Sequence, residues 1–324
     1  MSNQTVTPPL ITIGLTCFNA QETIVRALES ALSQDWPEFE VLIVDDCSTD
    51  NSVAAIEHCI ADQPSARLVQ HKINAGAAAA RNTLLREAKG SFLVFFDDDD
   101  VSHPERVRVQ YQRIVDFENE IGSKLIFCFA SGRRRYPNGY DKVQTAIGSK
   151  SAIPSGEAVA DYLLFNDRKP DLFYGSGTPT CALMARVEIL RELGGFDTSL
   201  RRVEDVDLAV RLALAGGSCI GCPEELYLQY ASVGSDKTPL KNLEAELAML
   251  DKHSDYLTKK GRLAYARQWF LIRYLHFSGQ RAAFAFRLAI FLVRFPVKGM
   301  RHLLRSGPTR VAHERKMKAE ATRV

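Results

Sequence analysis

The fold class is decided by residues 91–100, which read SFLVFFDDDD. An unbroken apolar run that ends in four carboxylates is typical of a strand that is buried on both faces and opens onto a polar edge. Similar runs rich in Val, Ile, Leu and Phe recur nearby, so that the expected strands cover residues 10–16, 39–45, 66–70, 91–96 and 124–130. Buried runs of this kind predict parallel strands.

Helical patterns lie between these runs. In the first of them Ile24, Leu28 and Leu32 share one face, and Asn19 is placed to cap the helix. Further helices are expected at residues 52–62, 77–88, 104–119, 157–166 and 204–215, with a strand at 179–185 and helices beyond residue 240. Residues 131–156 are rich in polar and turn-forming residues and are expected to form a long irregular insertion. The alternation predicts an α/β fold on a mostly parallel, doubly wound sheet.

Charge divides the chain into two parts. The 324 residues carry a net charge of +2, but residues 252–324 hold 17 Lys and Arg against 3 Asp and Glu, a net charge of +14. The remaining residues hold 24 basic and 36 acidic side chains, a net charge of −12. We therefore expect an acidic domain at 1–240 and a basic helical extension at 241–324 that seeks an anionic surface.

The cysteines and the N-terminal residues point to a reducing compartment. Seven cysteines are an odd number, and the start MSNQT lacks the basic region and apolar core of a signal peptide. No run reaches the roughly 18 apolar residues of a membrane span. We expect a cytoplasmic protein, either free or peripheral on the inner face of the cytoplasmic membrane.

Polar residues gather where the expected strands end, which is where ligands bind in an open α/β sheet. They are Thr16 and Asn19, Asp45 and Asp46, Asn74 with Gly76, Arg81 and Asn82, and Asp97 to Asp100. The turn after the first strand lacks Gly-x-Gly-x-x-Gly, and no P-loop sequence occurs. Their absence excludes a dinucleotide-dependent dehydrogenase and a P-loop phosphate site.

The acidic run at residues 97–100 predicts a metal site. Four neighbouring carboxylates repel one another as anions unless a cation binds among them. In an extended backbone Asp97 and Asp99 point to the same side and could bind that cation together. Oxygen ligands suit Mg²⁺ or Mn²⁺, whose coordination is commonly completed by water and substrate phosphates. A solvated acidic loop is the alternative, but a run that abuts a buried strand favours the metal.

Together these motifs resemble those of family 2 glycosyltransferases of the GT-A fold. The matching stretches follow the family order over residues 10–235 and are 16–19 (TCFN), 44–50 (VDDCSTD), 74–76 (NAG), 81–82 (RN), 96–100 (FDDDD), 194–197 (GGFD) and 204–205 (ED) with Arg211. The resemblance implies a nucleotide-binding half at about 10–130 and an acceptor half at about 157–235. It also implies a metal-dependent, inverting hexosyltransferase that moves a sugar from a nucleotide-diphospho-sugar, most simply UDP-linked, to a glycan or lipid-linked acceptor during cell-surface polysaccharide assembly.

The resemblance assigns site residues as well. Those for the nucleotide sugar are Thr16, Asn19, Asp46, Asn74, Gly76, Arg81, Asp97 and Asp98. Within this set Thr16 and Asp46 would hold a uracil-type base, and Asp97 or Asp98 would reach the ribose. Asp99, together with Asp97, would hold the Mn²⁺ or Mg²⁺ in an Asp-x-Asp (DXD) pattern.

The second acidic constellation, at residues 204–207, opens a helix. Carboxylates in a first helical turn already stabilise the helix dipole, so their presence alone does not demonstrate catalysis. Inversion needs one base on the face opposite the leaving group and no nucleophilic carboxylate. The residues alone do not rank Asp205 above Asp207; the resemblance assigns the base to Asp205, with Glu204 as its neighbour or substitute.

The chain departs from the family pattern at two places. Phe18 stands where Tyr is common, and residues 228–237 lack the His-containing motif that often adds a metal or phosphate contact. Lys237 is the nearest replacement for that charge. The segment at 175–178 (GSGT) either faces the acceptor or is an ordinary connecting loop.

The basic extension leaves two interpretations open. Residues 262–277 and 280–295 are expected to form two helices in which aromatic side chains alternate with Arg and Lys. They either pack as a hairpin with solvated arginines or meet anionic lipid, where each charge contributes ~1 kcal/mol; we expect a mixture. No nucleic-acid-binding motif accompanies the charge, so nucleic acid is not expected. From residue 309 onward we expect a frayed or disordered helix.

Two other functions remain alternatives. A nucleotidyltransferase that makes activated sugars would usually carry a Gly-rich basic loop after the first strand, and none is present. A non-catalytic, transferase-like protein that binds a membrane or a partner is favoured by the missing His motif and disfavoured by the intact acidic run.

Overall fold

The computed structural model describes residues 7–150, 152–231 and 238–321. The chain divides into two compact units. Unit 1 comprises Met1–Arg134, Val143–Ala160 and Lys169–Tyr230. Unit 2 comprises Arg135–Lys142, Asp161–Arg168 and Ala231–Val324. Unit 2 thus takes in two short segments that lie well ahead of the domain boundary expected at residue 240.

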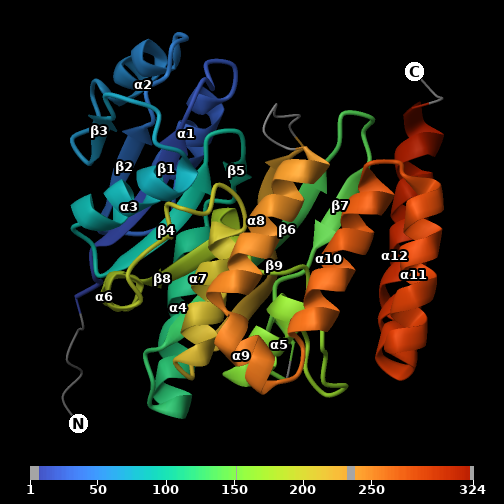
Figure 1. Ribbon diagram of the computed structural model, residues 1–324. Helices are drawn as coiled ribbons and strands as arrows, with labels where there is room; N and C mark the ends of the chain where they lie inside the picture. The colour runs from blue at the N-terminus through green and yellow to red at the C-terminus, as the bar shows by residue number, and fades with distance from the viewer. Residues whose placement is uncertain (1–6, 151, 232–237, 322–324) are drawn as a thin grey trace. The chain divides into compact units, whose positions relative to one another are not determined.

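Unit 1 is built on a mixed sheet with the strand order β3-β2-β1-β4-β8-β6-β9-β5 (Figure 1). The strands of the chain are β1 Ile11–Cys17, β2 Phe39–Asp45, β3 Ala66–Gln70, β4 Phe92–Asp97, β5 Val101–Ser102, β6 Ile126–Arg135, β7 Asp141–Gln144, β8 Leu183–Arg186 and β9 Ser218–Tyr230. Strand β4 is antiparallel to β8, but β1 to β4 are parallel to one another. Their carboxyl ends therefore meet at one edge of the sheet, as the sequence predicts.

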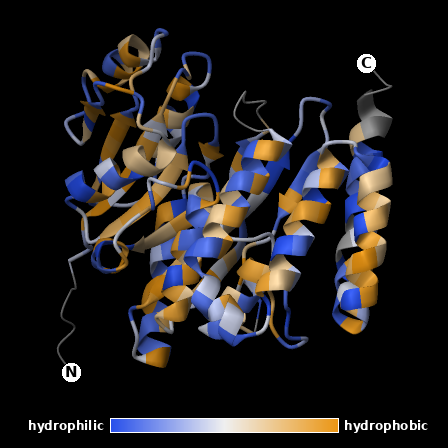
Figure 2. Ribbon diagram, in the orientation of Figure 1, coloured by the Kyte–Doolittle hydropathy of each residue, from blue (hydrophilic) through white to orange (hydrophobic). Residues whose placement is uncertain are grey.

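The parallel half of the sheet forms because its strands are apolar on both faces. Every residue of β2 after Phe39 is buried, and Figure 2 shows β1, β2 and β4 as nearly continuous orange ribbons. Helix α3 (Ala77–Glu87) packs on β1 and β2. It does so at close range, because a Cβ added at Gly14 would lie 2.9 Å from a methyl of Leu84. This packing fixes the height of α3 above the sheet.

The remaining helices connect the strands and form most of unit 2. They are α1 Ile24–Leu32, α2 Ser52–Ile60, α4 Arg106–Ile121, α5 Glu157–Phe165, α6 Val187–Glu192, α7 Glu204–Leu214, α8 Pro239–Lys252, α9 Ser254–Lys259, α10 Leu263–Phe277, α11 Arg281–Arg294 and α12 Pro296–Ala321. A 3₁₀ turn, Thr180–Ala182, precedes β8. The α/β fold class and the helical C-terminal region expected from the sequence are confirmed.

Two local expectations are wrong. Residues 131–156 are not an irregular insertion, because β6 extends through Arg135 and β7 follows it. Strand β6 is antiparallel to β8 rather than part of a parallel array. The polar and basic sequence of residues 131–144 lies in regular structure, which hydrophobic periodicity alone does not detect, and an apolar run such as that of β6 does not encode the direction of its partner. The helix expected from residue 309 onward is the C-terminal part of α12, which ends at Ala321.

Asn19 does not cap the first helix. Helix α1 begins at Ile24, and its N-cap residue is Thr23, whose side chain makes no capping hydrogen bond. Asn19 instead has a positive φ of 50° and lies in the turn between β1 and α1. Its side chain is consequently directed to a neighbouring loop, as described below.

Candidate active site

Register places the polar strand ends side by side. Thr16 at the end of β1 lies between Val44 of β2 and Asp97 of β4. Asp45 closes β2 and Asp46 follows it; both are buried, with exposed fractions of 1% and 4%. The parallel strands therefore gather a hydroxyl and three carboxylates within one edge of the sheet.

Asp46 is held by the loop that follows β3. Its Oδ1 accepts a hydrogen bond from the backbone N–H of Ala75 (2.9 Å) and lies 2.7 Å from Nδ1 of His71, while its Oδ2 accepts from the N–H of Gly76 (2.7 Å). Gly76 has a φ of +90°, which glycine adopts without strain. Asn74, the residue ahead of this clamp, is exposed. The clamp fixes the Asp46 carboxylate at the edge of the sheet.

Asn19 joins the loop after β1 to the loop after β2. Its Oδ1 accepts from the N–H of Thr49 (2.8 Å), and its own N–H donates to Oγ of Ser48 (2.9 Å). The Asn19 side chain thus organises the loops around Asp46 rather than a helix end. A polar residue that tolerates positive φ is required at this position, and Asn meets both conditions.

The acidic run after β4 forms a tight turn. Strand β4 ends at Asp97, and the N–H of Asp100 returns toward the carbonyl oxygen of Asp97 at 3.4 Å. Oδ2 of Asp98 accepts from the N–H of Phe18 (3.0 Å), and burial, reinforced by Asp97 and Asp99, raises the pKa of Asp98 to about 7. The turn therefore directs successive carboxylates to different sides.

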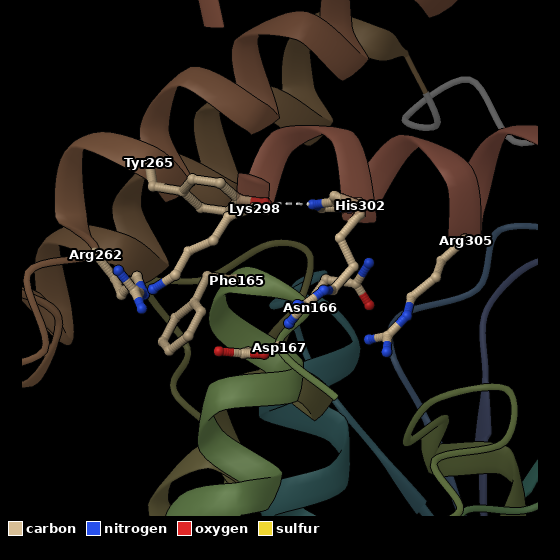
Figure 3. Close-up of a pocket in the computed structure, with 9 residues that line it drawn as sticks. Phe165, Asn166, Asp167, Arg262, Tyr265, Lys298, His302 and Arg305 are labelled. Atoms are coloured by element: carbon tan, nitrogen blue, oxygen red, sulfur yellow. Dashed lines mark hydrogen bonds between the residues drawn. The ribbon is translucent and has the colours of Figure 1, made fainter. Parts of the chain in front are cut away.

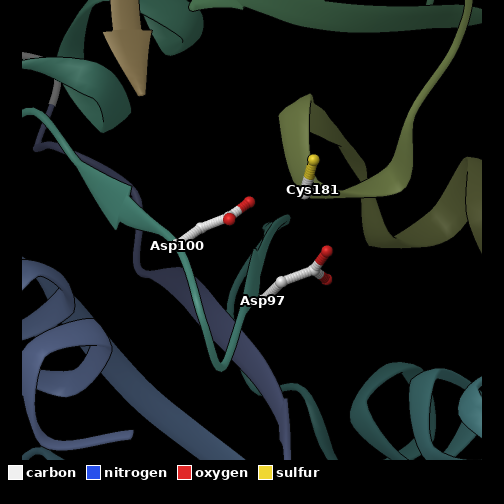
Figure 4. Close-up of side chains that lie close together, drawn as sticks. All are labelled: Asp97, Asp100 and Cys181. Atoms are coloured by element: carbon white, nitrogen blue, oxygen red, sulfur yellow. The ribbon is translucent and has the colours of Figure 1, made fainter. Parts of the chain in front are cut away.

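Asp97, Asp100 and Cys181 come together behind this turn. Each offers one ligand atom, and the three atoms lie within 4.8 Å of one another (Figure 4). Asp100 is 5% exposed, and its Oδ2 has no hydrogen-bond partner in the described part of the chain. Asp99 lies in the same turn but outside this cluster.

The donor set of the cluster fits a hard divalent cation. Burial, with the charges of Asp97 and Asp99, raises the pKa of Asp100 to about 9, so a nearby cation would relieve a strongly unfavourable anion. Carboxylate oxygens are the ligands that Mg²⁺ and Mn²⁺ prefer. Burial keeps the pKa of Cys181 well above its ordinary value, and a neutral thiol is a poor ligand for these ions. The two carboxylates are therefore the groups of the cluster that could hold such a cation.

Arg81 links this turn to the second acidic constellation. Its Nη1 donates to Oε1 of Glu204, and its Nη2 lies 3.7 Å from Oδ1 of Asp97. Burial alone would lower the pKa of Arg81, but Asp97, Glu204 and Asp205 together raise it, so the guanidinium stays charged. Arg81 is thus a fixed positive charge between two groups of acids.

Helix α7 presents Glu204 and Asp205 from its first turn. The residue before them, Val203, has a φ of +58°, which is strained for a β-branched side chain. Such strain is concentrated at functional sites. Oδ1 of Asp205 accepts from the N–H of Val206 (2.8 Å). Burial and the charge of Glu204 raise the pKa of Asp205 to about 6, while Arg81 opposes the rise.

Asp207 has a structural role, which separates it from Asp205. It is fully buried, and its Oδ2 accepts from Nε of Arg211 at 2.9 Å. Arg211 also donates to the carbonyl oxygens of Leu193 and Gly195. The pair therefore ties helix α7 to the loop at residues 193–197. Glu204 is the acid of this turn that pairs with Arg81, and Asp205, the next residue, forms no ion pair of its own with an arginine that the structure describes.

Asn82 fixes the same loop from the other side. It accepts from the N–H of Phe196 and donates to the carbonyl oxygen of Phe196, both at 2.8 Å. A Cβ at Gly195 would lie 2.5 Å from Oδ1 of Asn82, and Gly195 has a φ of +66°, so only glycine fits. These contacts explain why the family-like residues at 82 and 194–197 occur together.

Several site features carried no sequence signal or a weak one. Cys181 and His71 belong to no motif. Arg106 is 1% exposed and donates to the carbonyl oxygen of Phe95 in β4. The segment at 175–178 is partly packed, because a Cβ at Gly175 would lie 2.3 Å from a carbonyl oxygen. Lys237, the expected substitute for the missing His, lies outside the described residues.

Comparison with known proteins identifies the class. The model of glycosyl transferase family 2 matches residues 12–186. The structure of Staphylococcus aureus TarS 1-349 in complex with UDP-GlcNAc is similar with a TM-score of 0.59 at 20% identity, over 87% of this chain and 80% of that one. The fold is therefore that of GT-A glycosyltransferases.

The chain belongs to glycosyl transferase family 2. It is 28% identical over 230 residues to the succinoglycan biosynthesis protein ExoO of Rhizobium meliloti. The aligned residues make up 70% of this chain and 62% of ExoO. It is 37% identical over 101 residues to the putative colanic acid biosynthesis glycosyl transferase WcaA of Escherichia coli, over 31% of this chain and 36% of WcaA. Among the described residues, no helix is both long enough and apolar enough to span a bilayer.

Replacing Asp207 with Asn is expected to lower the free energy of unfolding by about 3 kcal/mol, because it removes the buried partner of Arg211. Asp205→Asn is the matched control and should change stability by less than about 1 kcal/mol, because a carboxylate with a raised pKa gains nothing from its charge in the folded state. Urea unfolding followed by circular dichroism measures both. Equal losses in the two variants would show that Asp207 has no special structural role.

Proposed function

We propose that the protein is an inverting glycosyltransferase that moves a sugar from a nucleotide-diphospho-sugar, UDP-linked in the simplest case, to an acceptor hydroxyl. One observation carries the proposal: Arg81 joins Asp97, which lies beside Asp100, to Glu204, which directly precedes Asp205. The first group suits a cation and the second suits a base. Binding of UDP and UDP-GlcNAc by TarS supports the donor class.

The base and ribose are bound at the ends of β1 and β2 in this proposal. Thr16 and the clamped Asp46 lie beside each other at the sheet edge and would contact a uracil-type base. A carboxylate has about four lone-pair directions, so Asp46 can accept from a ring N–H in addition to its internal donors. Asp98 lies beside the loop after β1 and would reach the ribose hydroxyls.

Asp97 and Asp100 would hold the divalent cation, Mn²⁺ or Mg²⁺, with Asp99 of the same turn available as a further oxygen ligand. When bound, such a cation neutralises the charge that develops on the departing diphosphate. Arg81 adds a fixed positive charge next to Asp97, on the side of the turn that the diphosphate would occupy. Its guanidinium is oriented by Glu204, so it needs no rearrangement during the reaction.

Asp205 would be the base that accepts the proton of the acceptor hydroxyl. A pKa of about 6 leaves it ionised at neutral pH and makes it a better proton acceptor than an ordinary Asp. Direct attack at the anomeric carbon with one base inverts its configuration. The names of ExoO and WcaA place those proteins in polysaccharide biosynthesis, which supports a growing cell-surface glycan or a lipid-linked glycan as the acceptor.

A thermal-shift panel of nucleotide sugars with and without Mn²⁺ tests the donor and the cation together. We expect one UDP-sugar with Mn²⁺ to stabilise the protein by about 2.7 kcal/mol at one hundred times its dissociation constant. Asp100→Asn should abolish the Mn²⁺-dependent part, while Asp62→Asn, an exposed matched control, should not. A panel without any Mn²⁺-dependent shift contradicts the metal site, and pyrophosphate release from a nucleoside triphosphate would favour a nucleotidyltransferase.

Asp205→Asn is expected to keep the nucleotide-sugar shift and to lower the rate of transfer by roughly 10²–10⁴-fold, because the amide cannot accept the hydroxyl proton. The rate is measured as UDP release with the donor selected by the panel. Asp207→Asn is unsuitable as a control because it perturbs the fold; Asp62→Asn serves again. Unchanged turnover in Asp205→Asn would remove this residue from the mechanism and favour a different base.

The pH dependence of kcat/KM should fall on the acid side near pH 6. Asp205 is active when deprotonated, so activity is retained above its pKa and lost as the pH falls through it. Glu204→Gln removes a like charge and releases Arg81, and both changes lower the pKa of Asp205. The acid limb should therefore move to lower pH in that variant. A limb that stays in place would point to Asp98, whose raised pKa does not depend on Glu204.

A further inference from the structure

A basic pocket lies wholly within unit 2, apart from the proposed active site. It has a cavity volume of about 50 Å³ and is lined by the C-terminal end of α5, the start of α10 and the first half of α12 (Figure 3). Its cationic side chains are Arg262, the N-cap residue of α10, and Lys298, Arg301 and Arg305 of α12. Nothing in the proposed sugar transfer uses this pocket.

The end of α5 forms one wall of the pocket. Asn166 has a positive φ of 53° and terminates the helix, and the N–H of Asp167 donates to the carbonyl oxygen of Asp161 at 3.1 Å. This turn presents Asn166 and Asp167 to the cavity. The carbonyl oxygen of Arg168 accepts from Nη1 of Arg305 (3.3 Å), which ties α12 to the same turn. These two hydrogen bonds therefore fix the position of this wall relative to α12.

The pocket carries more basic than acidic side chains. Its lining holds four basic side chains and one carboxylate, Asp167. Within the described ranges, no acidic group lies within ion-pair distance of Arg262, Lys298 or Arg301. An excess of positive charge in a cavity that is not balanced internally favours an anionic ligand.

The back of the pocket is buried and uncharged. Nδ1 of His302 lies 2.8 Å from the hydroxyl oxygen of Tyr265, and His302 is 3% exposed. Burial, with the charges of Arg168 and Arg273, lowers the pKa of His302 to about 4, so the imidazole is neutral at physiological pH. It adds no charge and needs no acidic partner, and the pocket keeps its positive surplus.

An exposed apolar row runs beside these cations on α12. Val297, Met300 and Leu304 are 69%, 47% and 67% exposed, and each directly precedes a basic pocket residue. The spacing i, i+3, i+7 places the apolar row on one helix face and the basic row next to it. Helix α11 adds further exposed apolar side chains, which are Phe286, Ile290 and Val293. Figure 2 shows the alternation of orange and blue along these two helices.

We propose that this pocket binds the phosphate group of an anionic membrane lipid, with the apolar row of α12 entering the interfacial region of the bilayer. A guanidinium group can donate two parallel hydrogen bonds to two oxygens of one phosphate, and Arg262 and Arg301 both offer such a group to the pocket. A soluble phosphate would satisfy the cations but leave Val297 and Leu304 in water. A lipid satisfies both rows at once, and helices with adjacent apolar and basic faces are typical of interfacial binding. The proposal is independent of the sugar donor.

The test is co-sedimentation of the full chain with vesicles of phosphatidylcholine alone and of phosphatidylcholine mixed with phosphatidylglycerol. We expect binding only to the anionic vesicles. The double variant Lys298→Gln/Arg301→Gln should lose about 30-fold in affinity, as two interactions of ~1 kcal/mol each imply. The matched control Arg281→Gln/Arg287→Gln removes two charges from α11 outside the pocket and should lose less than about 3-fold. All four residues are exposed, so both variants should fold, which their thermal midpoints would verify.

A second comparison separates a lipid from a free anion. Val297→Ser/Leu304→Ser should weaken vesicle binding while leaving the weak affinity for glycerol phosphate, measured by calorimetry, unchanged. Equal losses in the pocket and control variants would show that diffuse charge, rather than the pocket, causes binding. Tight binding of glycerol phosphate without any vesicle binding, or no binding to anionic vesicles, would overturn the proposal.

Discussion

The crowding of buried carboxylates at one sheet edge is the constraint on which the rest of unit 1 depends. The acids of the turn after β4 and of the α7 N-terminus cannot all be ionised in a medium of low dielectric without cations. Arg81 supplies one cation between Asp97 and Glu204. It leaves Asp205 with a pKa of about 6, whereas Asp100, which lies outside the ion pairs of Arg81, has a pKa of about 9. A divalent cation at Asp100 must therefore displace a proton, so metal affinity should rise with pH.

The other buried polar groups near the site hold its geometry. Asp207 and Arg211 tie α7 to the loop at 193–197, and Asn82 holds Phe196 by two hydrogen bonds. Each of these groups has its hydrogen-bonding capacity largely filled, as buried polar groups usually do. Filled hydrogen-bonding capacity thus distinguishes Asp207, which supports the fold, from Asp205, which has capacity left for a ligand. The sequence alone does not show this difference, because both Asp residues lie in one helical turn.

The sequence predicts the parallel half of the fold well and the acidic turn less well. Strands β2 and β3 have the predicted bounds. For β2 the reason is its continuous apolar run, which has few alternatives to a doubly covered strand, whereas β3 is the partly buried strand at the end of the sheet. The pairing of Asp97 with Asp99 was expected on the assumption of an extended backbone. The strand ends at Asp97 and the chain turns back, so that Asp100, rather than Asp99, returns to face Asp97. Cys181 joins them from a distant segment, and no local pattern encodes that approach.

The division of charge along the chain gives the basic pocket a physical reason. Residues 1–251 carry a net charge of −12, which repels an anionic bilayer, and residues 252–324 carry +14. Screening limits such forces to roughly 8 Å at physiological ionic strength, so the small net charge of the whole chain does not cancel them locally. Attraction to a membrane must then come from cations at the contact itself. Electrostatic attraction weakens with added salt whereas burial of apolar surface does not, and the apolar row of α12 therefore supplies the part of the binding that persists at high ionic strength.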